Sequence, residues 1–133
     1  MGSNLETIKD IYAAFGRGDV GFIVSNVTAD VDWASETAVD GAPWYGAHKG
    51  PDGVGQFFTE FGGACEVEDF TPEAFATNDD GDVFTIVRFR VKSRATGRVA
   101  SMRLHHYFKF RDGKIAYYCG TEDTALTVAI LQA

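Results

Sequence analysis

Hydrophobic residues in the first half of the chain recur at the three- and four-residue spacing of amphipathic helices. Ser3, with a glutamate three residues later, matches a capping box and predicts that a first helix begins here and ends at a glycine-containing turn, residues 16–18. Asp19 is placed to cap a second, shorter helix. A third helix is predicted from Pro51 to the glycine pair 62–63. The apolar positions are Leu5, Ile8, Ile11, Tyr12 and Phe15 in the first helix, Phe22, Ile23 and Val27 in the second, and Val54, Phe57, Phe58 and Phe61 in the third.

The rest of the chain has the alternating pattern of strands. Residues 31–35 alternate with period two, which predicts a strand with Val31, Trp33 and Ser35 on one face, followed by a loop over residues 37–50. From Cys65 onward, strands are separated by the turn dipeptides Asp80-Gly81, Thr96-Gly97 and Asp112-Gly113. Helices followed by antiparallel strands are typical of an α+β fold. We expect one domain, residues 1–133, in which a curved antiparallel sheet wraps around three N-terminal helices and encloses an apolar pocket.

The hairpin at Thr96-Gly97 predicts which side chains face inward. With a two-residue loop, one face of the hairpin is almost wholly apolar, and His106 lies on it opposite Val87. His105 then points outward. The predicted inward pairs are Val83 with Phe110, Thr85 with Phe108, Val87 with His106, Phe89 with Leu104 and Val91 with Met102. The outward face carries Arg88, Arg90, Lys92, Ser101, Arg103 and His105, too many cations to be buried alone.

The last hairpin has two possible registers, because Asp112-Gly113 permits either a two-residue turn or a three-residue loop with a bulge. The two-residue turn directs Tyr117, Cys119, Thr121 and Asp123 inward. The bulged form directs Tyr118, Gly120 and Glu122 inward.

Composition and charge narrow the function classes. Phe, Tyr and Trp make up 14% of the chain, more than a core of this size needs, and such rings often line concave apolar sites. The net charge of −7 argues against nucleic acid or anionic lipid as partners. No stretch has the length of a membrane span or the pattern of a signal peptide, and two isolated cysteines, Cys65 and Cys119, are expected to pack in the core. We expect a cytoplasmic protein.

His106 is the sharpest candidate for chemistry. Burial should lower the pKa of its imidazole and leave a neutral ring, which suits a general acid or base. The alternative is a core histidine whose ring nitrogens are satisfied by a tyrosine hydroxyl or a backbone carbonyl.

Aromatic residues are expected to form the pocket wall, and tyrosine hydroxyls and indole N–H groups would orient a ligand there. Trp44 and Tyr45 lie in a Gly/Pro loop, where large rings more often cover an opening than fill a core. Core packing is an equal alternative for Trp33 and Tyr118. The expected binding residues also include Phe57, Phe89 and Leu104, with Ser35 and Glu122 as polar candidates.

Metal and cofactor motifs are absent from the sequence. His48, His105 and His106 have no metal-ligand spacing, and residues 50–55 lack the strand and the Lys-Ser/Thr of a phosphate loop. We therefore expect no metal and no cofactor.

Three segments resemble the NTF2-like superfamily, in its SnoaL-like and ketosteroid-isomerase-like branch. They are the run from Tyr12 to Asp19 that precedes Asp30-Val31-Asp32-Trp33, the loop Trp44–Gly50 with the helix after it, and His106–Ile115 followed by Asp123-Thr124-Ala125. Together they cover nearly the whole chain. The resemblance implies a cone-shaped α+β barrel with a hydrophobic pocket, usually a homodimer packed through the outer sheet face.

The resemblance also maps the catalytic positions of the family onto this chain. In ketosteroid isomerases an Asp base works with a Tyr and a protonated Asp that hold an oxyanion, and these positions fall on Ser35, Ile11 and His106. Tyr12 is one residue away, which on a helix turns it by about 100°. The acid of SnoaL-type cyclases falls on Gly120, which favours the bulged hairpin because that acid faces inward. No match to the Asp-Arg-Asp set of limonene-epoxide hydrolases is found on the inward faces.

Two hypotheses follow. The first is a pocket for a small apolar molecule in which His106 supports proton transfer on a ketone or polyketide-like substrate, as in a cofactor-independent isomerase, cyclase or hydrolase. The second is a non-catalytic ligand-binding or dimerisation module, which the missing family acids favour.

Overall fold

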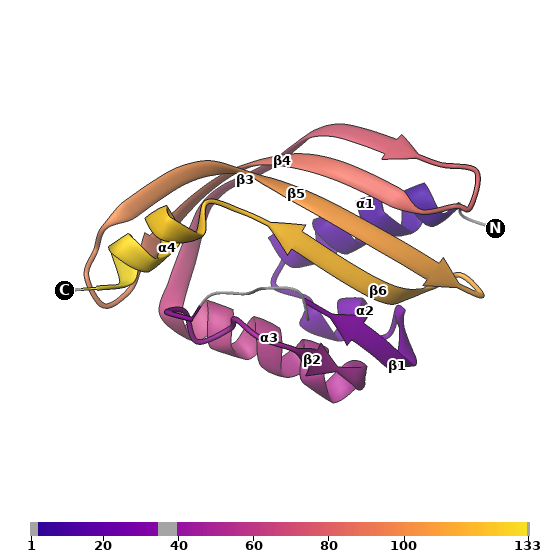
Figure 1. Ribbon diagram of the computed structural model, residues 1–133, viewed down its shortest axis with the longest axis horizontal. Helices are drawn as coiled ribbons and strands as arrows, with labels where there is room; N and C mark the ends of the chain where they lie inside the picture. The colour runs from indigo at the N-terminus through magenta and orange to yellow at the C-terminus, as the bar shows by residue number, and fades with distance from the viewer. Residues whose placement is uncertain (1–2, 35–39, 133) are drawn as a thin grey trace.

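The computed structural model describes residues 3–34 and 40–132 and has the α+β architecture that the pattern predicts. The helices are α1 (Asn4–Gly16), α2 (Val20–Val24), α3 (Gly50–Ala64) and α4 (Thr124–Leu131). The strands are β1 (Val27–Trp33), β2 (His48–Lys49), β3 (Cys65–Thr77), β4 (Val83–Ser93), β5 (Val99–Arg111) and β6 (Lys114–Thr121). Within the described residues they form one six-stranded sheet in the order β2-β1-β6-β5-β4-β3, in which only β1 and β6 pair in parallel. The long strands arch over α1, and α3 lies below them beside β1 and β2 (Figure 1).

Helix starts follow the predicted caps. The hydroxyl of Ser3 accepts a hydrogen bond from the backbone N–H of Glu6, and the carboxylate of Asp19 accepts one from Phe22. Pro51 lies in the first turn of α3. The second helix is shorter than predicted, because α2 ends at Val24 and residue 27 already belongs to β1.

The first strand begins earlier than the alternating pattern indicates. It starts at Val27, four residues before the predicted start at Val31, because Val27 already pairs in parallel with Ile115 of β6, and the pairing resumes at Asp32 after an irregularity. Val31 and Trp33 are buried as predicted. Ser35 lies outside the described residues.

The register of the hairpin between β4 and β5 differs from the prediction by two residues. Ser93 pairs with Arg98 around the four-residue loop 94–97, so Thr85 rather than Val87 lies opposite His106. The loop is longer because Gly97 takes a left-handed conformation, φ +75°, at its last position, and the Ser93 hydroxyl accepts from the N–H of Thr96. A two-residue shift keeps every side chain on its predicted face. His106 therefore points inward and His105 outward.

The hairpin between β5 and β6 combines the two predicted forms. Asp112 and Gly113, both at positive φ, make a two-residue turn, and one extra residue, Ala116, is inserted further along β6. Beyond this bulge Tyr118 and Gly120 lie on the inner face, as in the second alternative.

Two features of the C-terminal half were not foreseen. Helix α4 was missed because its sequence is apolar on all sides and has no amphipathic stripe, although Asp123 caps it by accepting from the N–H of Leu126. Cys119 is only partly buried, on the outer face opposite Tyr107, so the prediction of core packing was right for Cys65 alone.

On the outer sheet face, arginine side chains form salt bridges with acidic side chains of β3. Arg88 pairs with Asp69, Arg90 with Glu68 and Arg103 with Glu73, at N···O distances of 2.7, 2.9 and 2.7 Å. The sequence pattern predicted that these arginines lie on the outer face, but it did not predict their acidic partners. In the part of the chain that the structure describes, no helix has the length and apolar character needed to cross a membrane.

Candidate functional site

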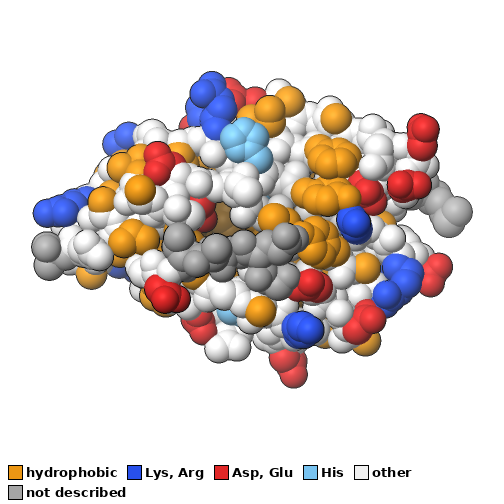
Figure 2. Space-filling model, in the orientation of Figure 1, with side chains coloured by type: hydrophobic (Ala, Val, Ile, Leu, Met, Phe, Trp, Pro, Cys, Tyr) orange, Lys and Arg blue, Asp and Glu red, His pale blue; other side chains and the backbone are white. Residues whose placement is uncertain are grey.

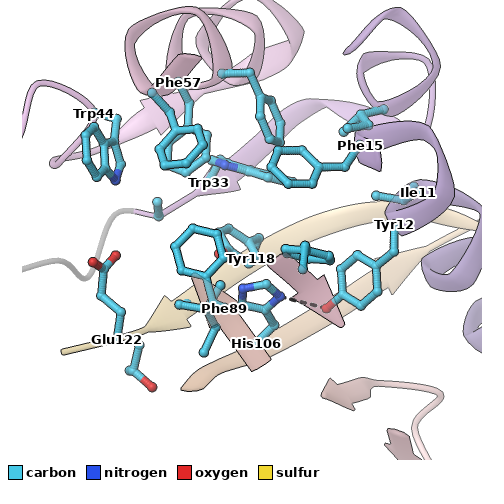
Figure 3. Close-up of a pocket in the computed structure, with 18 of the residues that line it drawn as sticks. Ile11, Tyr12, Phe15, Trp33, Trp44, Phe57, Phe89, His106, Tyr118 and Glu122 are labelled. Atoms are coloured by element: carbon cyan, nitrogen blue, oxygen red, sulfur yellow. Dashed lines mark hydrogen bonds between the residues drawn. The ribbon is translucent and has the colours of Figure 1, made fainter. Parts of the chain in front are cut away.

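An apolar cavity of about 110 Å³ lies between the inner sheet face and the helices (Figure 3). Every site residue predicted from the sequence lines this cavity except Ser35, which lies outside the described residues. The predicted residues that line it are Trp33, Trp44, Tyr45, Phe57, Phe89, Leu104, His106, Tyr118 and Glu122. The cavity is an aromatic cup with a few polar groups, the usual composition of a small-molecule site.

The aromatic walls are packed against one another. The Trp33 ring lies 4.3 Å from the ring of Tyr118 and 5.9 Å from that of Phe57 between centroids. Trp44 packs edge-on against Phe61 at 5.0 Å. Such contacts fix the rings, so the cavity is shaped before any ligand arrives.

His106 is held by a hydrogen-bonded chain that begins on helix α1. The hydroxyl of Tyr12 lies 2.6 Å from His106 Nδ1 and 2.5 Å from the hydroxyl of Thr85. Thr85 is the residue of β4 directly opposite His106. Three elements, α1, β4 and β5, therefore fix the orientation of one imidazole.

The direction of this chain assigns the tautomer of His106. If Tyr12 donates to Nδ1, the Thr85 hydroxyl donates to Tyr12, and every hydrogen in the chain has an acceptor. In the reverse direction the buried Thr85 hydroxyl would have no acceptor among residues 3–34 and 40–132. The first direction is favoured, and it leaves the hydrogen on Nε2.

Nε2 of His106 forms no hydrogen bond with the described residues, and it lies on the side of the ring away from Tyr12 (Figure 3). The second nitrogen of a satisfied core histidine would have a partner. The core-histidine alternative is therefore met at Nδ1, which is bonded to Tyr12. It is not met at Nε2, which is available to a ligand.

Burial determines the charge state of this group. Burial lowers the pKa of His106 to about 3, and the neighbouring His105 contributes to the same shift. Burial raises the pKa of Tyr12, and the hydrogen bond to Thr85 opposes this only in part. At physiological pH His106 is a neutral ring and Tyr12 a neutral phenol.

Tyr12 is the residue that the sequence reasoning missed. The family's tyrosine position falls on Ile11, and a rotation of about 100° was expected to take Tyr12 away from the pocket. Both residues line it, because the inward arc of α1 is wide and a tyrosine is long enough to reach the opposite strands. Tyr12 is the one residue with a hydroxyl in the apolar stripe of the predicted first helix, and this feature could have identified it as a site residue.

Tyr118 occupies the space in which a side chain at position 120 would lie. A Cβ atom built on Gly120 would lie 2.2 Å from Tyr118 Oη and 3.3 Å from His106 Cδ2. The cyclase acid expected at this position is thus replaced by a phenol beside His106. Tyr118 Oη has no hydrogen-bond partner in the described part of the chain, and burial raises its pKa, so it is a neutral donor.

A second polar group is built around Glu122, between β6 and α4. Its Oε2 accepts from Tyr45 Oη at 3.1 Å and from Thr127 Oγ1 at 2.5 Å. Burial, and then the negative charge of Glu122, raise the pKa of Tyr45. Thr127 was missed because α4 was missed. No three His, Cys, Asp or Glu side chains within residues 3–34 and 40–132 are arranged to hold a metal ion.

Comparisons with known proteins agree with this architecture. Residues 8–118 match the family described as "SnoaL-like domain". No curated protein matches the sequence. Among solved structures, an NTF2-like protein of unknown function from Burkholderia pseudomallei has a TM-score of 0.89 at 23% identity, with both chains fully covered.

Two further structures have names that mention a ligand or a reaction class. TerC, co-crystallised with polyporic acid, has a TM-score of 0.82 at 23% identity and 98% coverage of both chains. A candidate polyketide cyclase from Pseudomonas putida has a TM-score of 0.81 at 16% identity, covering 99% of this chain and 100% of its own. At these identities the likeness shows the fold alone. With the family match over most of its length, the chain belongs to the SnoaL-like domain family, and it shares the fold of an NTF2-like protein.

Proposed function

We propose that this protein binds a small, largely apolar ring compound and that His106 donates a hydrogen bond through Nε2–H to a carbonyl oxygen of that compound. The observation that carries the proposal is the neutral imidazole at the wall of an aromatic cup, oriented from behind by Tyr12. A neutral imidazole can act as an electrophile toward a carbonyl, as in triosephosphate isomerase.

The reaction class that fits is cofactor-independent proton transfer next to the carbonyl, as in an isomerase or a cyclase. When a water molecule takes the proton from the carbon next to a carbonyl, negative charge develops on the carbonyl oxygen, and water later returns a proton to carbon. Fixed donors at that oxygen lower the barrier. Nε2–H of His106 and the hydroxyl of Tyr118 are the donors in this part of the cavity. The names of TerC's ligand and of the Pseudomonas putida protein support ring ketones or quinones as the compound class.

Exchange of carbon-bound hydrogen for deuterium in enolisable ketones tests this proposal. The purified protein is incubated with cyclic and aryl ketones in D₂O, and exchange is followed by NMR. The protein-dependent exchange rate of His106→Ala should be at least tenfold lower than that of the wild type, since removing one oxyanion-hole donor lowers kcat by roughly 10²–10³-fold in established cases. His105→Ala is the matched control, because that ring points out of the cup. Equal rates for wild type and His106→Ala would refute the catalytic role.

A non-catalytic binding module is the second candidate, favoured by Gly120. The position of the cyclase acid has no side chain, and Tyr118 fills the space. Native mass spectrometry of the purified protein distinguishes the two candidates. A bound compound that is released unchanged after prolonged incubation supports binding alone.

We also propose a homodimer through the outer sheet face. Hydrophobic side chains form a row on the face in Figure 2. Phe84 and Ile86 of β4 are 37% and 36% exposed, and the Phe84 ring stacks on Tyr107 at 4.7 Å. The neighbouring arginines are already paired with acids, so a second copy meets a surface of balanced charge. Exposed aromatic residues within such a surface are typical of protein interfaces.

A further inference from the structure

The end of the cavity at Glu122 contains an acceptor that is held in place but not fully used. Tyr45 and Thr127, from the loop before β2 and from α4, both donate to Oε2 of Glu122. Oε1 receives no hydrogen bond from any described residue, and it is not fully buried. The carboxylate is therefore fixed by one oxygen and presents the other.

Trp44 adds a donor at the same end. Its side chain is almost wholly buried, with 5% of the residue exposed, and it lines the cavity. Its Nε1 has no acceptor in the described ranges, yet it is not sealed off, unlike Nε1 of Trp33. Figure 3 shows the indole nitrogen of Trp44 and the carboxylate of Glu122 turned toward one another across this end of the pocket. Both atoms can be reached from the cavity and have no partner among the described residues, so both are suited to a ligand.

We infer that the ligand carries a hydroxyl group at this end, which donates to Oε1 of Glu122 and accepts from Nε1–H of Trp44. This inference rests on the proposed function, which places a carbonyl oxygen at His106. A hydroxyl fits both atoms through a single oxygen, whereas an ammonium cannot accept from the indole, an ether cannot donate to the carboxylate, and a second carboxylate would be repelled. The substrate class is thus a hydroxylated ring ketone or quinone.

The size of the cavity limits this class further. An apolar cavity of about 150 Å³ in another protein holds benzene. The 110 Å³ here is therefore of the order of one ring. A single ring with a carbonyl substituent on one side and a hydroxyl on the other has the size and the polarity of the enclosed part.

Calorimetric binding of three probes tests the inference: acetophenone, 3-hydroxyacetophenone and 4-hydroxyacetophenone. Wild type should bind the better hydroxy compound at least tenfold more tightly than acetophenone, because a hydrogen bond to a charged group is worth about one to two orders of magnitude in affinity. In Glu122→Gln this preference should fall below roughly threefold, since the amide can keep Tyr45 and Thr127 satisfied but removes the charge. Glu66→Gln, at an exposed position on β3, is the matched control and should behave as wild type.

The outcomes separate this inference from the proposed function. Equal binding of all three probes by wild type, or an undiminished preference in Glu122→Gln, overturns the hydroxyl site and leaves the carbonyl site standing. Absence of binding for every probe overturns both. Should Glu122→Gln fail to fold, Trp44→Phe tests the same site. Trp44→Phe should reduce the preference for the hydroxy compound over acetophenone several-fold, and an undiminished preference in this variant would contradict the inference.

Discussion

The hydroxyl of Tyr12 lies 2.6 Å from Nδ1 of His106, so a residue of the first helix decides which nitrogen of a strand histidine faces the cavity. Tyr12 does not itself need to touch a ligand to matter. It orients the ring from behind and, through Thr85, fixes the position of the ring hydrogen.

Replacing Tyr12 by Phe should release this constraint. Nδ1 of His106 and the Thr85 hydroxyl lose their partner, which should destabilise the protein by about 1–3 kcal/mol. The imidazole should then populate both tautomers. Urea denaturation measures the stability, and ¹⁵N chemical shifts of the ring report the tautomer. Tyr107→Phe, which loses a hydroxyl bond to Asp82 on the outer face, is the control. An unchanged single Nε2–H tautomer in Tyr12→Phe would contradict the assignment.

The lowered pKa of His106 predicts an acid sensitivity. The folded pKa of about 3 lies below the ordinary value of 6.5, so the unfolded chain binds the proton more readily. Stability from this group is therefore complete above pH 6.5 and declines as the pH falls toward 3, by up to ~1.4 kcal/mol per pH unit. Urea titrations of wild type and His106→Gln at pH 7, 5 and 4 isolate the effect, because other groups cancel. Parallel pH dependence in the two proteins would show that His106 is not buried in this way.

A side chain at position 120 should disturb the pocket. In Gly120→Ala the new Cβ lies 2.2 Å from Tyr118 Oη, so Tyr118 must move, and we expect a loss of about 1–3 kcal/mol. Combining Gly120→Ala with Tyr118→Phe should restore part of this stability, because the nearest clashing atom is gone. A double-mutant cycle measures the coupling. Gly55→Ala, in helix α3 with open space around it, is the control and should stabilise slightly. Additive effects of the two changes would contradict the contact.

Charge placed in the hydrophobic row of the outer face should separate the proposed dimer. Phe84→Lys puts an ammonium group where two copies would meet and should give a monomer in sedimentation at concentrations where wild type is dimeric. Gln56→Lys adds the same charge to an exposed position on α3 and should leave the dimer intact. A monomeric wild type, or a dimeric Phe84→Lys, would refute this interface.

Most of the fold follows from local patterns in the sequence. Capping residues and helical spacing predict three of the four helices, because one side of each faces the sheet. Alternation places His106 inward even though the hairpin register was wrong by two, since a shift by an even number of residues leaves the faces unchanged. Helix α4 was missed because it is apolar all round, so that periodicity carries no signal there.

The site was harder to predict than the fold. An aromatic pocket could be expected from composition, and His106 could be placed on its wall from strand alternation. Alternation left two registers open for Tyr118 and Glu122, and the family resemblance favoured the one that turns them inward. The chain from Thr85 through Tyr12 to His106 could not, because it joins residues 73 and 94 positions apart and depends on how deeply a helix packs into a curved sheet. Sequence spacing holds no information about such a contact.

The extra residue in β6 has a consequence for how this scaffold can change over time. Tyr118 and Gly120 face the interior because Ala116 offsets the alternation of the strand by one. Deleting the codon of Ala116 would remove the bulge and the offset together, so Tyr118 would still lie opposite Phe108 and Gly120 opposite His106. The bulge is thus a position at which this strand can lose a residue without exchanging its two faces, whereas a deletion in the regularly paired part of β6 would turn every later side chain to the other side.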